Sequence, residues 1–304
     1  METRTITIRV PATTANLGPG FDCLGLALDL WNEASFSTEG EGVRMDIHGL
    51  GVGVLPEGPE NTLAAQALYL ISVCGKPIPP NLLIRCENRI PPGSGLGSSA
   101  AAVLTGLLGG NALIGSPLSM DEILQLAVEA EGHPDNAGAA LLGGLVLSAR
   151  LDNGVVARKV PVAALQAAVV TPDFNLPTHQ ARSALPRQVP LADAVFNLGR
   201  TALTIEALRS GDLELLGQAM QDRLHQPYRL RLIPGAEQAF QSALTAGAAA
   251  VAISGAGPSV IAFASKNLEQ IAKAMQTAFA GAGLLSRSAI LAITELGAQV
   301  LIQD

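Results

Sequence analysis

PPGSGLGSSAAA, from Pro91 to Ala102, carries the clearest structural signal in this 304-residue chain. Gly93, Gly95 and Gly97 have no Cβ, so the backbone amides around them can approach a ligand and adopt positive φ angles. The small residues from Ser98 onward predict a buried helix, whose first N–H groups have no partner within the helix. The same helix end carries about half a positive charge from the helix dipole, which favours a bound anion such as a polyphosphate.

Two common nucleotide-binding motifs do not fit this loop. A P-loop requires G-x-x-x-x-G-K-[ST], and the sole Gly-Lys pair of the sequence, Gly75-Lys76, precedes a proline. A dinucleotide fingerprint requires G-x-G-x-x-G, whereas the spacing here is G-x-G-x-G. Composition alone also allows a flexible connector between a strand and a helix. The loop therefore indicates phosphate binding by some other glycine-rich motif.

Around this loop, hydrophobic patterning predicts strands that alternate with helices. Strands are expected over 5–10, 34–38, 44–48, 82–87, 144–151, 167–171, 249–253, 260–264, 289–294 and 299–302. Helices are expected over 61–73, 98–108, 119–130, 191–210, 213–221 and 268–282, and a helix of small residues is expected between Asn136 and the strand that starts at 144. The composition changes after the turn Asp152-Asn153-Gly154. We therefore expect two domains, 1–155 and 156–304.

The composition excludes several classes of protein. Only 3% of residues are aromatic and the formal net charge is -7, which argue against a nucleic-acid partner. Prolines and glycines interrupt the two long uncharged stretches, 90–120 and 238–265, so neither is expected to cross a membrane. The three cysteines are an odd number without a C-x-x-C pair, which is typical of reduced thiols. A soluble cytoplasmic protein is expected.

Two further glycine-rich stretches accompany the loop in a recognisable order. They are PATTANLGPGFDCLGLAL (Pro11–Leu28) and AISGAGPSVIAF (Ala252–Phe263). Together the three stretches resemble the conserved motifs of the GHMP kinases. The first stretch, with EGHPDN (Glu131–Asn136), THQARSALP (Thr178–Pro186) and HQPYRLRLIPG (His225–Gly235), is similar to the homoserine kinase branch of that superfamily.

The resemblance implies an α+β fold with two domains. The N-terminal ATP-binding domain would resemble ribosomal protein S5 domain 2, and the C-terminal domain would be ferredoxin-like. It further implies a homodimer that uses ATP and Mg²⁺ to convert L-homoserine to O-phospho-L-homoserine and ADP in threonine biosynthesis. Many superfamily members have an Asp as catalytic base, but here Asn136 occupies the candidate position. We therefore expect direct in-line transfer without an obvious catalytic base.

The resemblance also assigns roles to individual residues. Because homoserine is a zwitterion with a hydroxyl group, its site needs a carboxylate anchor, an ammonium acceptor and a hydroxyl contact. The residues implied for homoserine are Asn16, Asp22, His133, Asn136, Thr178, Arg182 and Arg229. Those implied for catalysis are Asn136, Asp22, Ser99 and Glu129, of which Ser99 and Glu129 would bind the metal, with Glu131 as a rival ligand. Those implied for ATP are Asn61, Pro91, Pro92, Gly93, Ser94, Gly95, Leu96, Gly97, Ser98, Ser99, Ala100, Ala101, Gly255 and Gly257.

Three other functions are compatible with parts of the sequence. Another kinase of the superfamily that acts on a small alcohol would share the loop, although the set Asp22, Arg182 and Arg229 suits an amino acid better than a sugar or an isoprenoid. A catalytically silent nucleotide sensor would not need Ser99 and Glu129, so their presence argues against it. A dinucleotide-dependent oxidoreductase does not match the glycine spacing.

Overall fold

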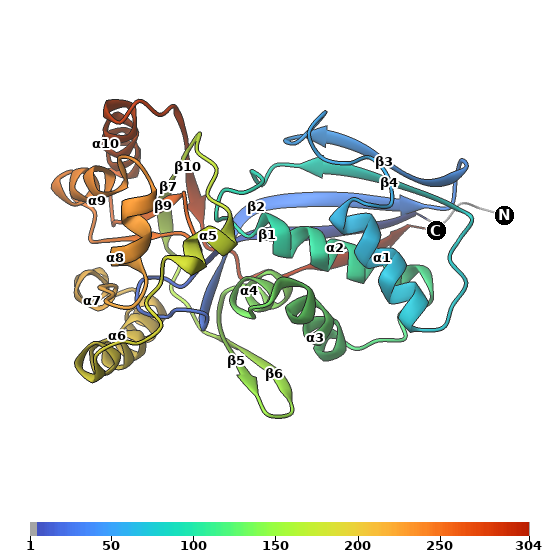
Figure 1. Ribbon diagram of the computed structural model, residues 1–304, viewed down its shortest axis with the longest axis horizontal. Coiled ribbons are helices and arrows are strands. Elements are labelled where there is room, and N and C mark those ends of the chain that lie inside the picture. Colours follow the sequence, from blue (N-terminus) through green and yellow to red (C-terminus); the bar gives the residue numbers. More distant parts are fainter. Residues whose placement is uncertain (1–4, 304) are drawn as a thin grey trace.

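The computed structural model describes residues 5–303 and contains two β-sheets with helices packed against them (Figure 1). The larger sheet has seven strands in the order β11-β1-β2-β4-β3, with β5 paired to β2 and β6 paired to β5. Its strands are β1 (Thr5–Ala15), β2 (Leu24–Ser37), β3 (Gly42–Gly49), β4 (Asn81–Asn88), β5 (Leu145–Leu151), β6 (Gly154–Val160) and β11 (Gln299–Gln303). All pairings are antiparallel except that of β3 with β4.

Four helices cover one face of this sheet (Figure 1). They are α1 (Thr62–Val73), α2 (Ser98–Leu113), α3 (Met120–Glu131) and α4 (Asp135–Leu142). The helix predicted from Ser98 is buried along most of its length, and its glycines let α1 approach closely. A Cβ at Gly106 would meet the carbonyl of Leu63, and a Cβ at Gly110 would meet the carbonyl of Ala67. The run of small residues therefore sets the position of α2 in the core.

The smaller sheet has four antiparallel strands in the order β10-β7-β9-β8. These are β7 (Gln166–Pro172), β8 (Ala250–Ile253), β9 (Val260–Phe263) and β10 (Ser286–Ala292). The helices of this half are α5 (Thr178–Ser183), α6 (Leu191–Ser210), α7 (Leu213–Ala219), α8 (Gln226–Arg229), α9 (Ala236–Thr245) and α10 (Leu268–Gly281). A separate apolar cluster, which includes Ile253, Met275 and Phe279, fills the space between this sheet and α9 and α10. The fold is α+β, as the sequence predicted.

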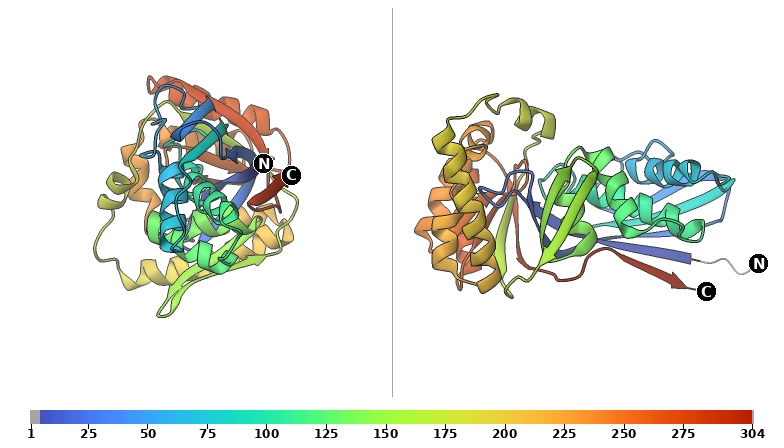
Figure 2. Two further views of the ribbon diagram at one scale, coloured as in Figure 1. Left: turned by 90° about the vertical axis from the view of Figure 1, so that its right-hand side faces the viewer. Right: turned by 90° about the horizontal axis from the view of Figure 1, so that it is seen from below.

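The two sheets do not divide the chain at one point. Strand β6 still belongs to the larger sheet and ends at Val160, and β7 opens the smaller one at Gln166. Strand β11 then returns to the larger sheet and lies beside β1, as Figure 2 shows. The division at 155/156 and the two domain names stay predictions. Within residues 5–303, no helix is both long and apolar enough to cross a membrane.

Candidate active site

A cleft of about 320 Å³ lies where the two halves of the molecule meet. We call one side the loop end, formed by residues 93–95, residues 97–100 and Glu131. We call the other the charged end, formed by Asn16, Asp22, Arg182 and Arg229. Residues of both ends line the same cleft. The three glycine-rich stretches quoted above, which lie as much as 240 residues apart, therefore converge on one site.

The shape of the loop end depends on the turn between β8 and β9. Gly95 has φ +80°, and a Cβ there would lie 2.7 Å from the carbonyl oxygen of Gly257 and also meet that of Ser254. The Ser254 hydroxyl donates to the Gly95 carbonyl at 2.7 Å. Gly97, the N-cap of α2, has φ +71° and lies in the left-handed region. The predicted arrangement, in which a glycine loop leads directly into a helix N-terminus, is present.

Ser99 and Glu131 meet at the loop end. The Ser99 hydroxyl donates to Glu131 Oε1 at 2.6 Å, and burial raises the pKa of the Glu131 carboxyl. Of the two carboxylates that the sequence left open as partners of Ser99, the structure brings Glu131 to it, whereas Glu129 is exposed and does not line the cleft. An α-helix turns about 100° per residue, so side chains two positions apart point to nearly opposite faces. Glu131, the last residue of α3, accordingly lines the cleft, whereas Glu129 is exposed to solvent.

The junction between α3 and α4 positions Asn136. The buried Asp135 carboxylate accepts from the backbone N–H of Asn136 at 2.8 Å and lies 3.1 Å from His133 Nδ1. This hydrogen bond raises the pKa of His133. From the other side, the hydroxyl of Thr13 on β1 donates to Asn136 Oδ1 at 2.8 Å. The sequence reasoning missed Asp135 and Thr13, although Asp135 stands inside the EGHPDN segment.

At the charged end, Asp22 and Arg182 bind each other. Arg182 donates from both terminal nitrogens to the two Asp22 oxygens, at 2.6 and 2.9 Å. Asp22 has φ +54°, and Asn16 Oδ1 accepts from its backbone N–H at 2.9 Å. The side-chain nitrogen of Asn16, Nδ2, donates to the Gly255 carbonyl at 2.8 Å. Asp22 and Arg182, two of the residues that the resemblance implies for homoserine, are thus paired with one another.

Arg229 is almost completely buried at the base of the charged end, with 1% of its surface exposed. Burial lowers the pKa of its guanidinium to about 10, so the group stays positively charged at neutral pH. One of its terminal nitrogens donates to the Gly255 carbonyl at 3.1 Å. The centre of the Phe21 ring lies 5.0 Å from the guanidinium carbon of Arg229 and 5.5 Å from that of Arg182.

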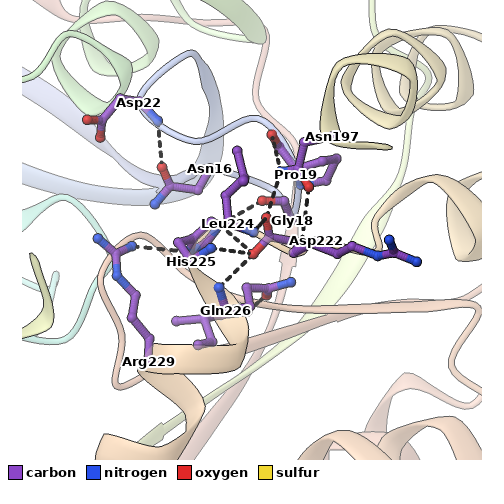
Figure 3. A network of polar contacts seen from close by, with 12 residues as sticks. Asn16, Gly18, Pro19, Asp22, Asn197, Asp222, Leu224, His225, Gln226 and Arg229 are labelled. Carbon is purple, nitrogen blue, oxygen red and sulfur yellow. Dashed lines mark hydrogen bonds and ion pairs between the residues drawn. The ribbon is translucent and has the colours of Figure 1, made fainter. Parts of the chain in front are cut away.

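A buried polar network supports this end of the cleft (Figure 3). The Asp222 carboxylate accepts from Asn197 Nδ2 and from three consecutive backbone N–H groups, which include that of His225. His225 Nε2 lies 2.7 Å from the Gly18 carbonyl, so Nε2 donates and Nδ1 is free to accept from Arg229 at 3.4 Å. Burial lowers the pKa of His225, which keeps the ring neutral. The network therefore connects the turn after β1 to the helix that carries Arg229.

The remaining predicted residues fall into three groups. Five line the main cleft: Ser94, Ala100, Thr178, Gly255 and Gly257. Asn61 and Pro92 line a smaller pocket next to Ser98, and Pro91 lies in a neighbouring groove. Leu96 and Ala101 are buried in the core and do not line the cleft. In the described part of the chain, no three His, Cys, Asp or Glu side chains cluster as metal ligands.

Comparison with known proteins places this geometry in a family. The family model described as GHMP kinases N terminal domain matches residues 61–144, and that described as GHMP kinases C terminal matches residues 204–281. The homoserine kinase of Moorella thermoacetica is 45% identical over 295 residues, which cover 97% of this chain and 99% of that protein. The homoserine kinase of Synechococcus sp. (strain CC9902) is 44% identical over 298 residues, with coverage of 96% and 94%.

Solved structures give the same result for the fold. The homoserine kinase of Cytophaga hutchinsonii superposes with a TM-score of 0.86 at 33% identity, over 98% of this chain and 97% of that one. The mevalonate kinase of L. major, solved in complex with R-mevalonate, superposes with a TM-score of 0.68 at 18% identity, over 96% of each chain. The second likeness concerns the fold alone.

Proposed function

The chain belongs to the homoserine kinase family of the GHMP kinases, and on that premise we propose that it transfers the γ-phosphoryl group of ATP to the hydroxyl group of L-homoserine. One observation carries the proposal: a single cleft joins a glycine loop at a helix N-terminus to a set of opposite charges that suits a zwitterion. The products are O-phospho-L-homoserine and ADP, and the reaction belongs to threonine biosynthesis.

The nucleotide occupies the loop end in this proposal. The amides of the loop and the first turn of α2 bind the phosphates, and the pocket lined by Asn61 and Pro92 takes the base. The oxygen pair of Ser99 and Glu131 fits Mg²⁺, which prefers oxygen ligands and keeps other positions for phosphate and water. When bound, the metal ion would neutralise phosphate charge. Ser99 and Glu131 are the residues that would hold it.

The amino acid occupies the charged end. Asp22 and Asn16 receive the ammonium group, and Arg182 and Arg229 receive the carboxylate, because planar guanidinium groups match carboxylates with paired hydrogen bonds. The hydroxyl group then points toward the loop end, where Asn136 contacts it. Thr178 and His133 complete the contacts from the sides of the cleft.

The reaction is a direct displacement at phosphorus. The homoserine oxygen forms a bond to the γ-phosphorus as the bond from that phosphorus to the ADP oxygen breaks, and the hydroxyl proton passes to an oxygen of the transferred phosphoryl group or to solvent. Such transfers pass through a loose transition state, so alignment of the hydroxyl matters more than its early deprotonation. The Thr13 hydroxyl and the Asp135 carboxylate hold Asn136 from two sides, which fixes the group that orients the hydroxyl. No catalytic base is assigned.

A comparison of substrates tests the proposal. ADP release would be measured with L-homoserine, L-serine, mevalonate and galactose in parallel, at the same ATP and Mg²⁺ concentrations. We expect L-homoserine to have the highest kcat/KM. Preference for any of the other three would contradict the proposal, and ATP binding without turnover of any of them would favour the nucleotide sensor.

The homodimer and the cytoplasmic location are proposed on the family resemblance. Light scattering tests the dimer, which would have twice the chain mass of 31.2 kDa.

A further inference from the structure

The N-terminal part of α6, up to Thr204, buries polar residues and exposes apolar ones. Its buried residues are Asn197 and Thr204. Asn197 Nδ2 donates to the Asp222 carboxylate at 2.7 Å, and the hydroxyl of Thr201 on the same side donates to the Pro19 carbonyl at 2.9 Å. These hydrogen bonds attach α6 to the turn after β1, whereas the side of a helix that packs on a protein core is normally the apolar one.

The opposite side of α6, which we call the outer face, is apolar and exposed. It consists of Leu191, Val195, Leu198, Gly199, Ala202 and Leu203. Leu191 is 80% exposed and Leu198 72%, so nothing else in residues 5–303 covers them, and Figure 1 shows α6 at the outside of the half that holds the smaller sheet. The first three large side chains and Ala202 follow one another at intervals of 4, 3 and 4 residues, the spacing of a seam at which one helix packs on another. A contiguous apolar patch of this kind marks an interaction surface.

Charge favours a second copy of this chain as the occupant. The outer face has no charged side chain, so a partner recognised by charge would gain no ion pair there. An anionic lipid surface is disfavoured, because helices that bind such surfaces carry many Lys and Arg residues, whereas this chain has a formal net charge of -7. Two acidic residues beside the face are neutralised within the protomer, since Arg223 donates to Asp193 at 3.0 Å and Arg209 donates to Glu206 at 2.7 Å. A second copy therefore brings neither of these carboxylates unpaired to the face.

The outer face also complements itself. In an antiparallel pair of α6 helices with a two-fold axis at Gly199, Val195 of one copy lies opposite Leu203 of the other, because each is four positions from Gly199. Packed helices have axes about 8–10 Å apart and Cα atoms about 2.3 Å from each axis, so the two Gly199 Cα atoms would approach to about 3.4–5.4 Å.

The presence of Gly199 is itself unexplained within one copy. Glycine in the middle of a helix is destabilising relative to alanine. A Cβ at Gly199 would meet nothing within 4 Å, so the packing of the protomer does not require a glycine there. The close approach of a second helix does require a small residue at the point of contact.

We propose that the outer face of α6 is the surface through which two copies of this chain associate, with the two helices antiparallel and Gly199 at the two-fold axis. The inference goes beyond the proposed kinase reaction, and it assigns an interface to the homodimer that was proposed above on the family resemblance alone.

The first experiment measures the mass of substituted proteins by light scattering. Val195→Glu places a carboxylate opposite apolar side chains, where it has no partner, so the mass should fall from that of two chains to the 31.2 kDa of one. Val73→Glu is the matched control, because Val73 is a helical residue of α1 with 57% exposure against 59% for Val195. This control should keep the mass of two chains.

Two results of this experiment would overturn the proposal. A monomeric wild type would show that the outer face binds something other than a second copy. A dimeric Val195→Glu would show that the copies associate through another surface, which would leave the homodimer in place and remove α6 from its interface.

The second experiment tests the antiparallel arrangement by cross-linking. Under mild oxidation Gly199→Cys should form a disulfide-linked dimer, because the expected distance between the facing Cα atoms overlaps the range found in disulfides. Ala192→Cys is the control, since Ala192 is exposed on the same side of α6 but an antiparallel pair would hold its two copies about 21 Å apart. The wild type treated in the same way gives the background from its three cysteines.

Absence of the dimer in Gly199→Cys, or equal cross-linking of Gly199→Cys and Ala192→Cys, would overturn the antiparallel pairing. Neither experiment depends on turnover. A wild-type dimer that cross-links as expected but does not phosphorylate L-homoserine would therefore contradict the proposed kinase reaction alone.

Discussion

The loop end and the charged end of the cleft differ in the groups that they present to a charged ligand. The loop end has few charged side chains, and it presents backbone N–H groups from a loop whose glycines have positive φ. The charged end relies on side chains that neutralise one another, and on a buried network that holds Arg229 and His225. A formal net charge of -7 is therefore no obstacle to binding a polyphosphate, because local amides determine the field there.

The two ends should therefore tolerate different amino-acid substitutions. The loop end depends on the absence of side-chain atoms, so adding one atom should be harmful. The charged end depends on exact partners, so it should respond to the loss of one charge or one hydrogen bond.

Gly95→Ala should have the largest effect. The added Cβ would lie 2.7 Å from the Gly257 carbonyl oxygen at a φ of +80°, and the combined strain and overpacking should cost about 2–5 kcal/mol of unfolding free energy. Urea denaturation measures the loss, and titration with ATP should show weaker binding. Gly93→Ala is the matched control, since Gly93 has a similar φ of +65° but an added Cβ would lie 3.4 Å from its nearest neighbour, Asn175 Oδ1. Equal losses in the two variants would show that the contact with the β8–β9 turn is unimportant.

Glu131→Gln comes next, because it removes the one carboxylate that contacts Ser99 at the loop end. We expect kcat to fall on the order of 100-fold and the Mg²⁺ concentration for half-maximal rate to rise. Glu129→Gln is the control and should stay within about twofold of the wild type, because this side chain faces solvent. A larger effect of Glu129→Gln than of Glu131→Gln would reverse the assignment.

Asn136→Ala tests the boundary between the two ends. It removes a neutral hydrogen-bonding group, so kcat with L-homoserine should fall about tenfold while the affinity for ATP is unchanged. Single-turnover rates and ATP titration separate the two quantities. Loss of ATP binding would refute the role at the hydroxyl group.

The smallest effect is expected in the network below the charged end, as a dependence of stability on pH. Burial lowers the pKa of folded His225, so the unfolded state binds more protons below about pH 6.5 and stability falls as the pH falls. His133 has a raised pKa and acts in the opposite sense, losing its contribution as the pH rises. The variant His225→Gln keeps His133, so the difference between the wild type and this variant isolates the contribution of His225. The Gln side-chain amide can still donate to the Gly18 carbonyl.

Between pH 7 and pH 5.5, the wild type should lose about 1 kcal/mol more unfolding free energy than His225→Gln. Denaturant titrations of both proteins at both pH values measure the change in unfolding free energy of each. Parallel pH profiles of the two proteins would mean that His225 does not set the pH dependence.

The sequence predicted what local patterns can specify. The helices expected over 61–73 and 119–130 are present, and each begins at a capping residue: Asn61 accepts from the Leu63 N–H at 3.0 Å, and Ser119 forms a capping box with Glu122. The short helices α5 and α8, of six and four residues, were missed because so few residues cannot show a helical period. The sequence predicted a strand over 34–38 alone, but the preceding apolar segment extends β2 back to Leu24.

Side-chain partners in the candidate site could be predicted less well. The motifs identified Asp22 and Arg182, but a contact across 160 positions leaves no local pattern, so their pairing was not foreseen. The same is true of Thr13 and Asn136, which lie 123 positions apart. The choice between Glu129 and Glu131 depended on which face of α3 meets the cleft, a fact of tertiary packing that the polar spacing of the helix does not contain.

The return of β11 to the edge of β1 also bears on the synthesis of the chain. At the usual 5–20 residues per second, about 15–60 s pass between the emergence of β1 and that of its partner from the ribosome. During that time β1 pairs with β2 on one side, and its other edge is open to pairing with a strand of another nascent chain. A chaperone that covers this edge until residue 303 has appeared should therefore raise the yield of folded protein.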